Sequence, residues 1–90
     1  MNTSQIKEVS ADGDVTTADA HLRLVSLTAG SDAATLVVKA GGSSGTTVLT
    51  LKAAANTSVV APCLTDAFCA NGVHADLTGT GPVATFVYVA

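Results

Sequence analysis

The chain has little charge and few aromatic side chains. Charged residues make up 12% of its 90 residues, about half the usual fraction for a soluble domain, and the aromatic residues are Phe68, Phe86 and Tyr88. Large aromatic side chains supply much of the buried area in a small core, so a core made mainly of Val, Ala and Leu is thin. Association would bury further apolar area, and we therefore expect a homo-oligomer, with a trimer as the expected form.

The basic residues are too few and too scattered for a nucleic-acid-binding face. They are Lys7, Arg23, Lys39 and Lys52, and the net charge is −3, whereas a nucleic-acid binder needs a clustered basic surface. The apolar runs are only a few residues long, too short to span a membrane. The polar N-terminal stretch also lacks the apolar segment of a signal peptide. We expect neither a nucleic-acid nor a membrane partner.

One twelve-residue stretch occurs twice. Residues 27–38 read LTAGSDAATLVV and residues 77–88 read LTGTGPVATFVY, an alignment without gaps at an offset of 50. Each copy has an apolar strand, a turn rich in Gly, Ser, Asp or Pro, and a β-branched strand, which is the pattern of a β-hairpin. We predict two structurally equivalent hairpins in which Leu27 and Leu77 are both buried.

The whole chain indicates an all-β fold. Short apolar segments bounded by turn residues recur about every 8–12 residues, and none has a sustained helical period. The predicted strands are residues 20–28, 34–40, 47–53, 58–61, 73–78 and 84–90. Residues 5–10 offer a further edge strand. This makes six to seven short strands, which predicts a small antiparallel β-sandwich or barrel with two similar hairpins.

Local composition refines this outline. The apolar parity changes within residues 20–28, which predicts a bulge or burial on both faces. The run GGSSGT at residues 41–46 predicts a hairpin loop, and residues 62–72 are predicted to be irregular. Residues 1–19 are polar and are predicted to form an N-terminal arm on a single β domain of residues 20–90.

The one grouping of histidine with carboxylate is His21, His74 and Asp76. His74 and Asp76 share a strand face because they are two residues apart, and His21 would approach them if the two strands were neighbours. A zinc site needs about three protein ligands, and the pattern does not fix a third. Histidines at the surface or in an interface are the expected outcome.

The remaining candidate motifs are incomplete. Asp12-Gly13-Asp14 resembles the start of a calcium loop, but the twelfth position holds Arg23 in place of a bidentate Glu. Cys63 and Cys69 are compatible with two buried thiols, a disulfide or a metal site, and cytosolic synthesis favours the thiols. We predict no catalytic, cofactor-binding or metal residues, and we expect that the protein is not an enzyme.

Residues 20–90 carry a resemblance in their order of segments: LTAGSDAATLVV, a Ser/Gly loop, TVLTLKAAANTSV, DLTGTGP and an aromatic last strand. In this order the chain resembles small all-β virion proteins of tailed bacteriophages. Members with assigned roles include capsid cement or decoration proteins, which sit as trimers on the head. The resemblance implies a structural protein that is made in the host cytoplasm, binds the major capsid protein as an oligomer and stabilises the capsid surface.

Two other functions fit the same pattern. One is a tail, neck or fibre component of the virion. The other is a carbohydrate- or peptide-binding β-module, which would stack sugars on exposed aromatic side chains, and Phe68, Phe86 and Tyr88 are the candidates. For the capsid function, the arm at residues 1–19 is the segment expected to contact the shell.

Overall fold

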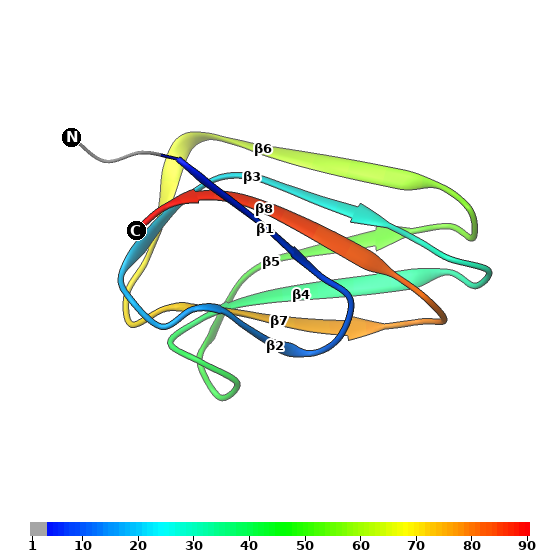
Figure 1. Ribbon diagram of the computed structural model, residues 1–90, viewed down its shortest axis with the longest axis horizontal. Helices are drawn as coiled ribbons and strands as arrows, with labels where there is room; N and C mark the ends of the chain where they lie inside the picture. The colour runs from blue at the N-terminus through cyan, green and yellow to red at the C-terminus, as the bar shows by residue number, and fades with distance from the viewer. Residues whose placement is uncertain (1–3) are drawn as a thin grey trace.

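Two four-stranded antiparallel sheets form the protein, as a computed structural model shows (Figure 1). The structure describes residues 4–90, except for the side chains of residues 63–67. One sheet has the strand order β1-β8-β3-β6 and the other β2-β7-β4-β5. The strands are β1 (Gln5–Val9), β2 (Gly13–Thr16), β3 (Ala20–Thr28), β4 (Ala34–Ala40), β5 (Thr46–Ala53), β6 (Ser58–Cys69), β7 (Val73–Thr78) and β8 (Val83–Val89).

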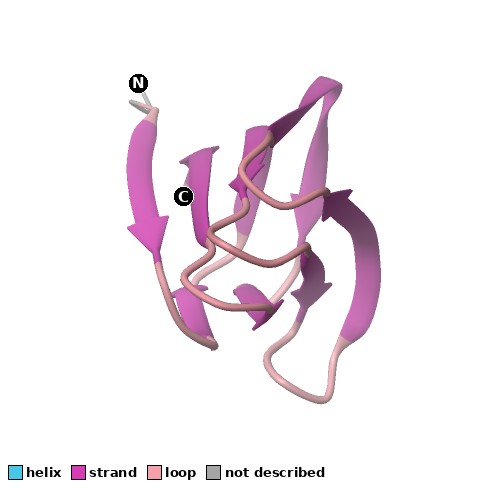
Figure 2. Ribbon diagram, turned by 90° about the vertical axis from the view of Figure 1, so that its right-hand side faces the viewer, coloured by secondary structure: helices cyan, strands magenta, loops and turns pink. Residues whose placement is uncertain are grey.

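The predicted all-β sandwich is confirmed. Residues 4–90 contain eight strands, one more than the upper limit of the prediction, and the two sheets stay separate, as in a sandwich and unlike a barrel. A second view along the long axis shows only strands and loops in this part of the chain (Figure 2).

The core lies between the two sheets. It forms because β-strand side chains alternate between faces, as in β4, where Ala34, Leu36 and Val38 are buried and the residues between them are half-buried. Phe86 is the largest fully buried side chain, and its burial contributes about 1.5–3 kcal/mol. The core residues are Val15, Ala20, Leu22, Val25, Leu27, Ala29, Ala34, Leu36, Val38, Ala53, Cys69, Val73, Ala75, Ala84, Phe86 and Tyr88.

Two strands of the predicted N-terminal arm pair with the β domain, and the edge strand predicted at residues 5–10 is confirmed as β1. Strand β1 pairs with β8 along five residue pairs, from Gln5 with Tyr88 to Val9 with Ala84, and β2 pairs with β7. Val15 is buried in the core. The polar composition of residues 1–19 is compatible with both strands because they lie at sheet edges, where alternate side chains reach solvent.

The repeated stretch forms sheet-to-sheet crossings, and the prediction of hairpins was wrong. Strand β3 lies in one sheet and β4 in the other, and β7 and β8 are divided in the same way (Figure 1). The first crossing runs from the β1-β8-β3-β6 sheet to its partner, and the second runs back. Leu27 is fully buried, whereas Leu77 is half-buried against the core. Local sequence gives the strand–turn–strand order but not the pairing partner, which is set by long-range packing.

The two copies of the repeat pair with each other. Strand β3 of the first copy pairs with β8 of the second, and β4 pairs with β7. Their turns are also in close contact, because a Cβ atom on Gly30 would lie 2.2 Å from the carbonyl oxygen of Thr80, the equivalent residue of the second copy. The repeat is therefore an approximate twofold relationship within one chain.

Two predicted irregularities have different outcomes. The bulge in β3 is confirmed, since the register shifts between Leu22 and Leu24. Residues 62–72 were predicted to be irregular, but β6 continues through Pro62 to Cys69, with residues 63–66 opposite the single residue Arg23. Proline is tolerated because β6 is an edge strand whose second side needs no hydrogen bonds from a neighbour. The hairpin predicted around residues 41–46 is confirmed by the antiparallel pairing of β4 with β5.

Candidate functional site

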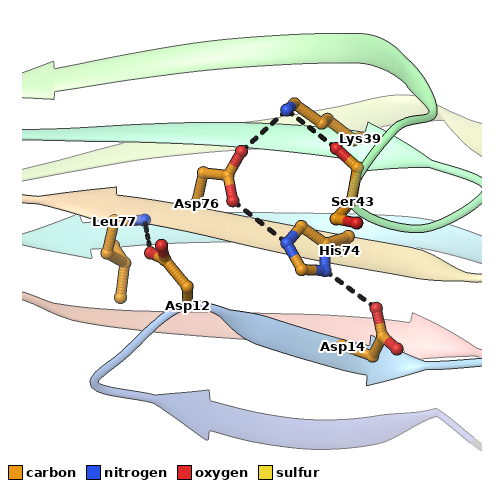
Figure 3. Close-up of polar contacts among 7 residues, drawn as sticks. All are labelled: Asp12, Asp14, Lys39, Ser43, His74, Asp76 and Leu77. Atoms are coloured by element: carbon orange, nitrogen blue, oxygen red, sulfur yellow. Dashed lines mark hydrogen bonds and ion pairs between the residues drawn. The ribbon is translucent and has the colours of Figure 1, made fainter.

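A row of charged side chains crosses the outer face of the β2-β7-β4-β5 sheet (Figure 3). Asp14 on β2 is paired in register with His74 on β7, and His74 is paired with Lys39 on β4. Asp76 follows two residues after His74 on the same face. The alternation of β7 explains the placement, because Val73 and Ala75 point into the core.

The side chains in this row form a continuous chain of polar contacts. The Nδ1 atom of His74 lies 2.8 Å from Oδ1 of Asp14, and its Nε2 atom lies 3.0 Å from Oδ1 of Asp76. The second oxygen of Asp76 lies 2.8 Å from Nζ of Lys39. Lys39 also donates to the carbonyl oxygen of Ser43, at 3.1 Å. The contacts therefore connect β2, β7, β4 and the loop between β4 and β5.

Both carboxylates raise the pKa of His74 above its ordinary value. The hydrogen bond to Asp14 is the largest cause, burial of the ring opposes it, and Asp76 adds to the increase. The hydrogen bond from Lys39 is the main cause of a lowered pKa at Asp76. A doubly protonated imidazolium can donate to both carboxylates, whereas a neutral ring has only one N–H to donate. The geometry therefore favours the cationic ring.

The acidic turn before β2 has a structural use. Asp12 accepts a hydrogen bond from the backbone N–H of Leu77, at 2.6 Å, and Asp14 holds His74 (Figure 3). Both aspartates of the Asp-Gly-Asp motif thus tie β2 to β7. Among the described residues, no group of three or more His, Cys, Asp or Glu side chains is arranged to hold a metal ion.

The structure brings together two of the three residues of the predicted grouping. His74 and Asp76 are in contact, but His21 lies in the other sheet, where its ring centroid is 5.0 Å from that of Phe68. Sequence reasoning missed Asp14 and Lys39. No local signal could have found them, because they are 60 and 35 residues away from His74 and meet it only through strand pairing.

An apolar row crosses the outer face of the other sheet. Ile6 on β1 is paired with Val87 on β8, Val87 with Leu24 on β3, and Leu24 with Pro62 on β6. Directly opposed residues share a face of an antiparallel sheet, so the four side chains form one stripe across all four strands. Ile6 has 74% of its surface exposed, and the other three are half-buried or exposed.

Further exposed apolar side chains flank this stripe. Val60 and Phe68, both on β6, have 59% and 55% of their surfaces exposed. Phe68 is the one exposed aromatic ring among the three candidates for sugar stacking, since Phe86 and Tyr88 are buried. No pocket was found in the part of the chain that the structure describes. The described face is therefore a surface with exposed apolar groups and no cavity for a small ligand.

The structure bears on two further sequence features, the pair of cysteines and the lack of a membrane-spanning segment. Cys69 is buried in the core, and the side chain of Cys63, on which the alternatives of thiols, disulfide and metal site also depend, lies outside the described residues. In residues 4–90, no helix is long and apolar enough to cross a membrane.

Comparison with known proteins gives one structural likeness. No protein-family model matches the chain, and no curated protein matches it. A chain from Bacillus endospore appendages, described as a novel family of disulfide-linked pili, is 16% identical, with a TM-score of 0.49 and coverage of 100% of this chain and 90% of that one. At this level the likeness assigns no function, and it gives no support to a phage origin.

Proposed function

We propose that the protein is a structural component of a larger particle, and that it binds the assembled particle through the outer face of its β1-β8-β3-β6 sheet. The specific form of this proposal is a decoration protein on a tailed-phage capsid, with the major capsid protein as partner and the virion surface as its location. Its role is to hold neighbouring subunits together, without catalysis.

The observation that carries the proposal is the apolar stripe of Ile6, Val87, Leu24 and Pro62. Contiguous exposed apolar groups on a soluble domain commonly mark a contact surface. The stripe runs across four strands, and Val60 and Phe68 add exposed apolar area beside it. A contact face on whose described residues no pocket was found suits a protein partner better than a small molecule, which binds in concave sites.

Stabilisation would follow from mass action. A protein that binds only the assembled shell favours that state by RT ln(1 + [L]/Kd), which is about 2.7 kcal/mol at a free concentration one hundred times Kd. An oligomer bridging several shell subunits would gain further from multivalency. The predicted trimer belongs to this proposal and is tested by the mass of the particle-free protein.

A tail, neck or fibre component is the second candidate. It is favoured by strand β5, an edge strand of eight residues without proline that has a hydrogen-bonded neighbour on one side only. A chain with an open sheet edge can pair with a further copy or with a neighbouring protein. A sugar-binding module has less support, because Phe68 is its one exposed aromatic side chain among the described residues.

The test is binding of the purified protein to particles that lack it, measured by co-sedimentation and located by electron microscopy. Ile6→Glu and Val60→Glu place a charge at two points of the apolar face, and each should weaken attachment at least about tenfold. Ser44→Glu adds the same charge to the exposed loop between β4 and β5 and should leave binding unchanged.

The results separate the candidates. Attachment to heads that is lost in the two face variants and kept in the control supports the decoration function. Attachment to tails or fibres supports the second candidate. Head binding that both face variants retain would show that this face is not the contact.

A further inference from the structure

The four edge strands differ in how they are protected against pairing with another chain. Strand β2 is only four residues long, and β1 carries the charged residues Lys7 and Glu8. Strand β6 contains Pro62 and a break in register opposite Arg23. Short length, charge, proline and irregularity are the common means by which proteins block open sheet edges.

Strand β5 has less of this protection, which is limited to a bulge at Val48, where its register with β4 shifts, and to the charge of Lys52 near its end. It spans eight residues, contains no proline, and carries no charge between Thr46 and Leu51. It has β4 as its hydrogen-bonded neighbour and ends the sheet on its other side. Leu49 and Leu51 are half-buried against the core, and both lie at this terminal strand. The edge therefore offers backbone hydrogen-bonding groups together with partly exposed leucine side chains.

The sequence of β5 is complementary to itself. In an antiparallel pair of two β5 strands centred on Thr50, Leu49 of each copy stands opposite Leu51 of the other, on the side that faces the core. Thr50 then faces its own equivalent on the outer side, where threonine pairs are favourable. Lys52 stands opposite Val48, so the two lysines are not opposed. Centring the pair on Leu51 would give one leucine pair in place of two and bring the lysines closer.

We propose that two copies of this chain associate through β5, joining their β2-β7-β4-β5 sheets across a twofold axis. A single self-complementary strand gives an isologous interface, which closes as a dimer. The β5 contact is separate from the proposed binding to a particle. It rests on that proposal only in the assumption that the protein forms assemblies. The β5 dimer is compatible with the predicted trimer if the dimer contact and the trimer contact occur together in a hexamer.

Sedimentation of the free protein across the micromolar range is the first test. The full chain should give about twice the 8.8 kDa chain mass, or an even multiple of it. Thr50→Lys sets two positive charges against each other at the axis and should lower the mass to that of a monomer or of a trimer. Gln5→Lys makes the same change in charge on the exposed edge strand β1 and should leave the mass unchanged. Circular dichroism confirms that both variants are folded.

Cross-linking tests the register. Directly opposed strand residues lie about 4.5–5.5 Å apart at Cα, which fits a disulfide, so Thr50→Cys should form a covalent dimer under mild oxidation. Gln5→Cys, with the same native cysteines, should not. A monomeric or trimeric full chain, an even-numbered assembly unaffected by Thr50→Lys, or cross-linking through Gln5→Cys instead of Thr50→Cys would each overturn the proposal. None of these measurements involves a capsid, so failure here leaves the proposed particle binding untouched, and only a monomeric full chain would contradict the predicted trimer as well.

Discussion

The imidazole of His74 lies 2.8 Å from the carboxylate of Asp14, and this contact joins an edge strand to the strand beside it. Strand β2 is short and has β7 as its pairing partner. A charge-assisted hydrogen bond is stronger than a neutral one, so the protonation state of His74 bears on how firmly β2 is held. The same ring contacts Asp76, which extends the effect to Lys39 on β4.

Stability should therefore fall as pH rises from neutral. The folded-state pKa of His74 is raised above 6.5, chiefly by Asp14. Its contribution is fully present below the unfolded-state pKa, about 6.5, and is lost as pH rises through the folded value. Thermal unfolding should show a melting temperature that declines as the pH rises from about 6.5 through the folded-state pKa of His74. Asp14→Asn should flatten it and lower the pKa of His74 in an NMR titration, whereas Glu8→Gln, which removes a distant exposed carboxylate, should change neither. An unshifted His74 titration in Asp14→Asn would contradict this account.

At acid pH the dependence has the opposite direction, because the contribution of Asp76 to stability is lost as the pH falls. Lys39 and His74 hold the pKa of Asp76 below its ordinary 3.8. This contribution is present above about pH 3.8 and is lost as pH falls through the lowered folded-state value. Asp76→Asn should reduce the loss of stability in acid, seen as a shallower fall in melting temperature below pH 4 than in the unmodified chain. An equally steep fall would show that other carboxylates govern the acid response.

Removal of residues 1–14 should destabilise the whole domain. The deletion takes away β1 and the start of β2, together with the contacts of Asp12 and Asp14 with β7. It also exposes the edge of β8, which carries Phe86 and Tyr88. Deletion of residues 1–3, which leaves β1 (Gln5–Val9) intact, is the matched control and should leave the urea midpoint unchanged. A truncated chain with the midpoint of the full-length protein would show that residues 1–14 do not stabilise the rest of the domain.

The sequence was sufficient for the fold class because alternation, turn residues and the lack of a helical period are local properties. It also located the bulge in β3 and the loop between β4 and β5, each of which is marked by its own residues. It did not give the pairing of strands. Hairpins and sheet crossings share the same strand–turn–strand pattern, and the choice between them depends on partners that lie up to 83 residues away, as Gln5 and Tyr88 do. The sequence predicted only two of the four residues of the charged row for the same reason. His74 and Asp76 lie two residues apart on one strand, whereas Asp14 and Lys39 lie on two other strands.

The close contact between the two repeat turns provides the last prediction. A Cβ atom at Gly30 would lie 2.2 Å from the backbone oxygen of Thr80, far inside van der Waals contact, and backbone cannot rotate away as a side chain can. Gly30→Ala should therefore force the two turns apart and lower the free energy of unfolding by about 1–3 kcal/mol, the usual range for overpacking. The control is Gly13→Ala, since a Cβ atom there would meet no atom within 4 Å and its φ is not positive. That variant should be neutral or stabilising by up to about 1 kcal/mol. Urea unfolding of both variants measures the difference. Equal stability of the two would mean that the turns of the repeat are not packed against each other, and that the internal twofold relationship does not contribute to holding the sheets together.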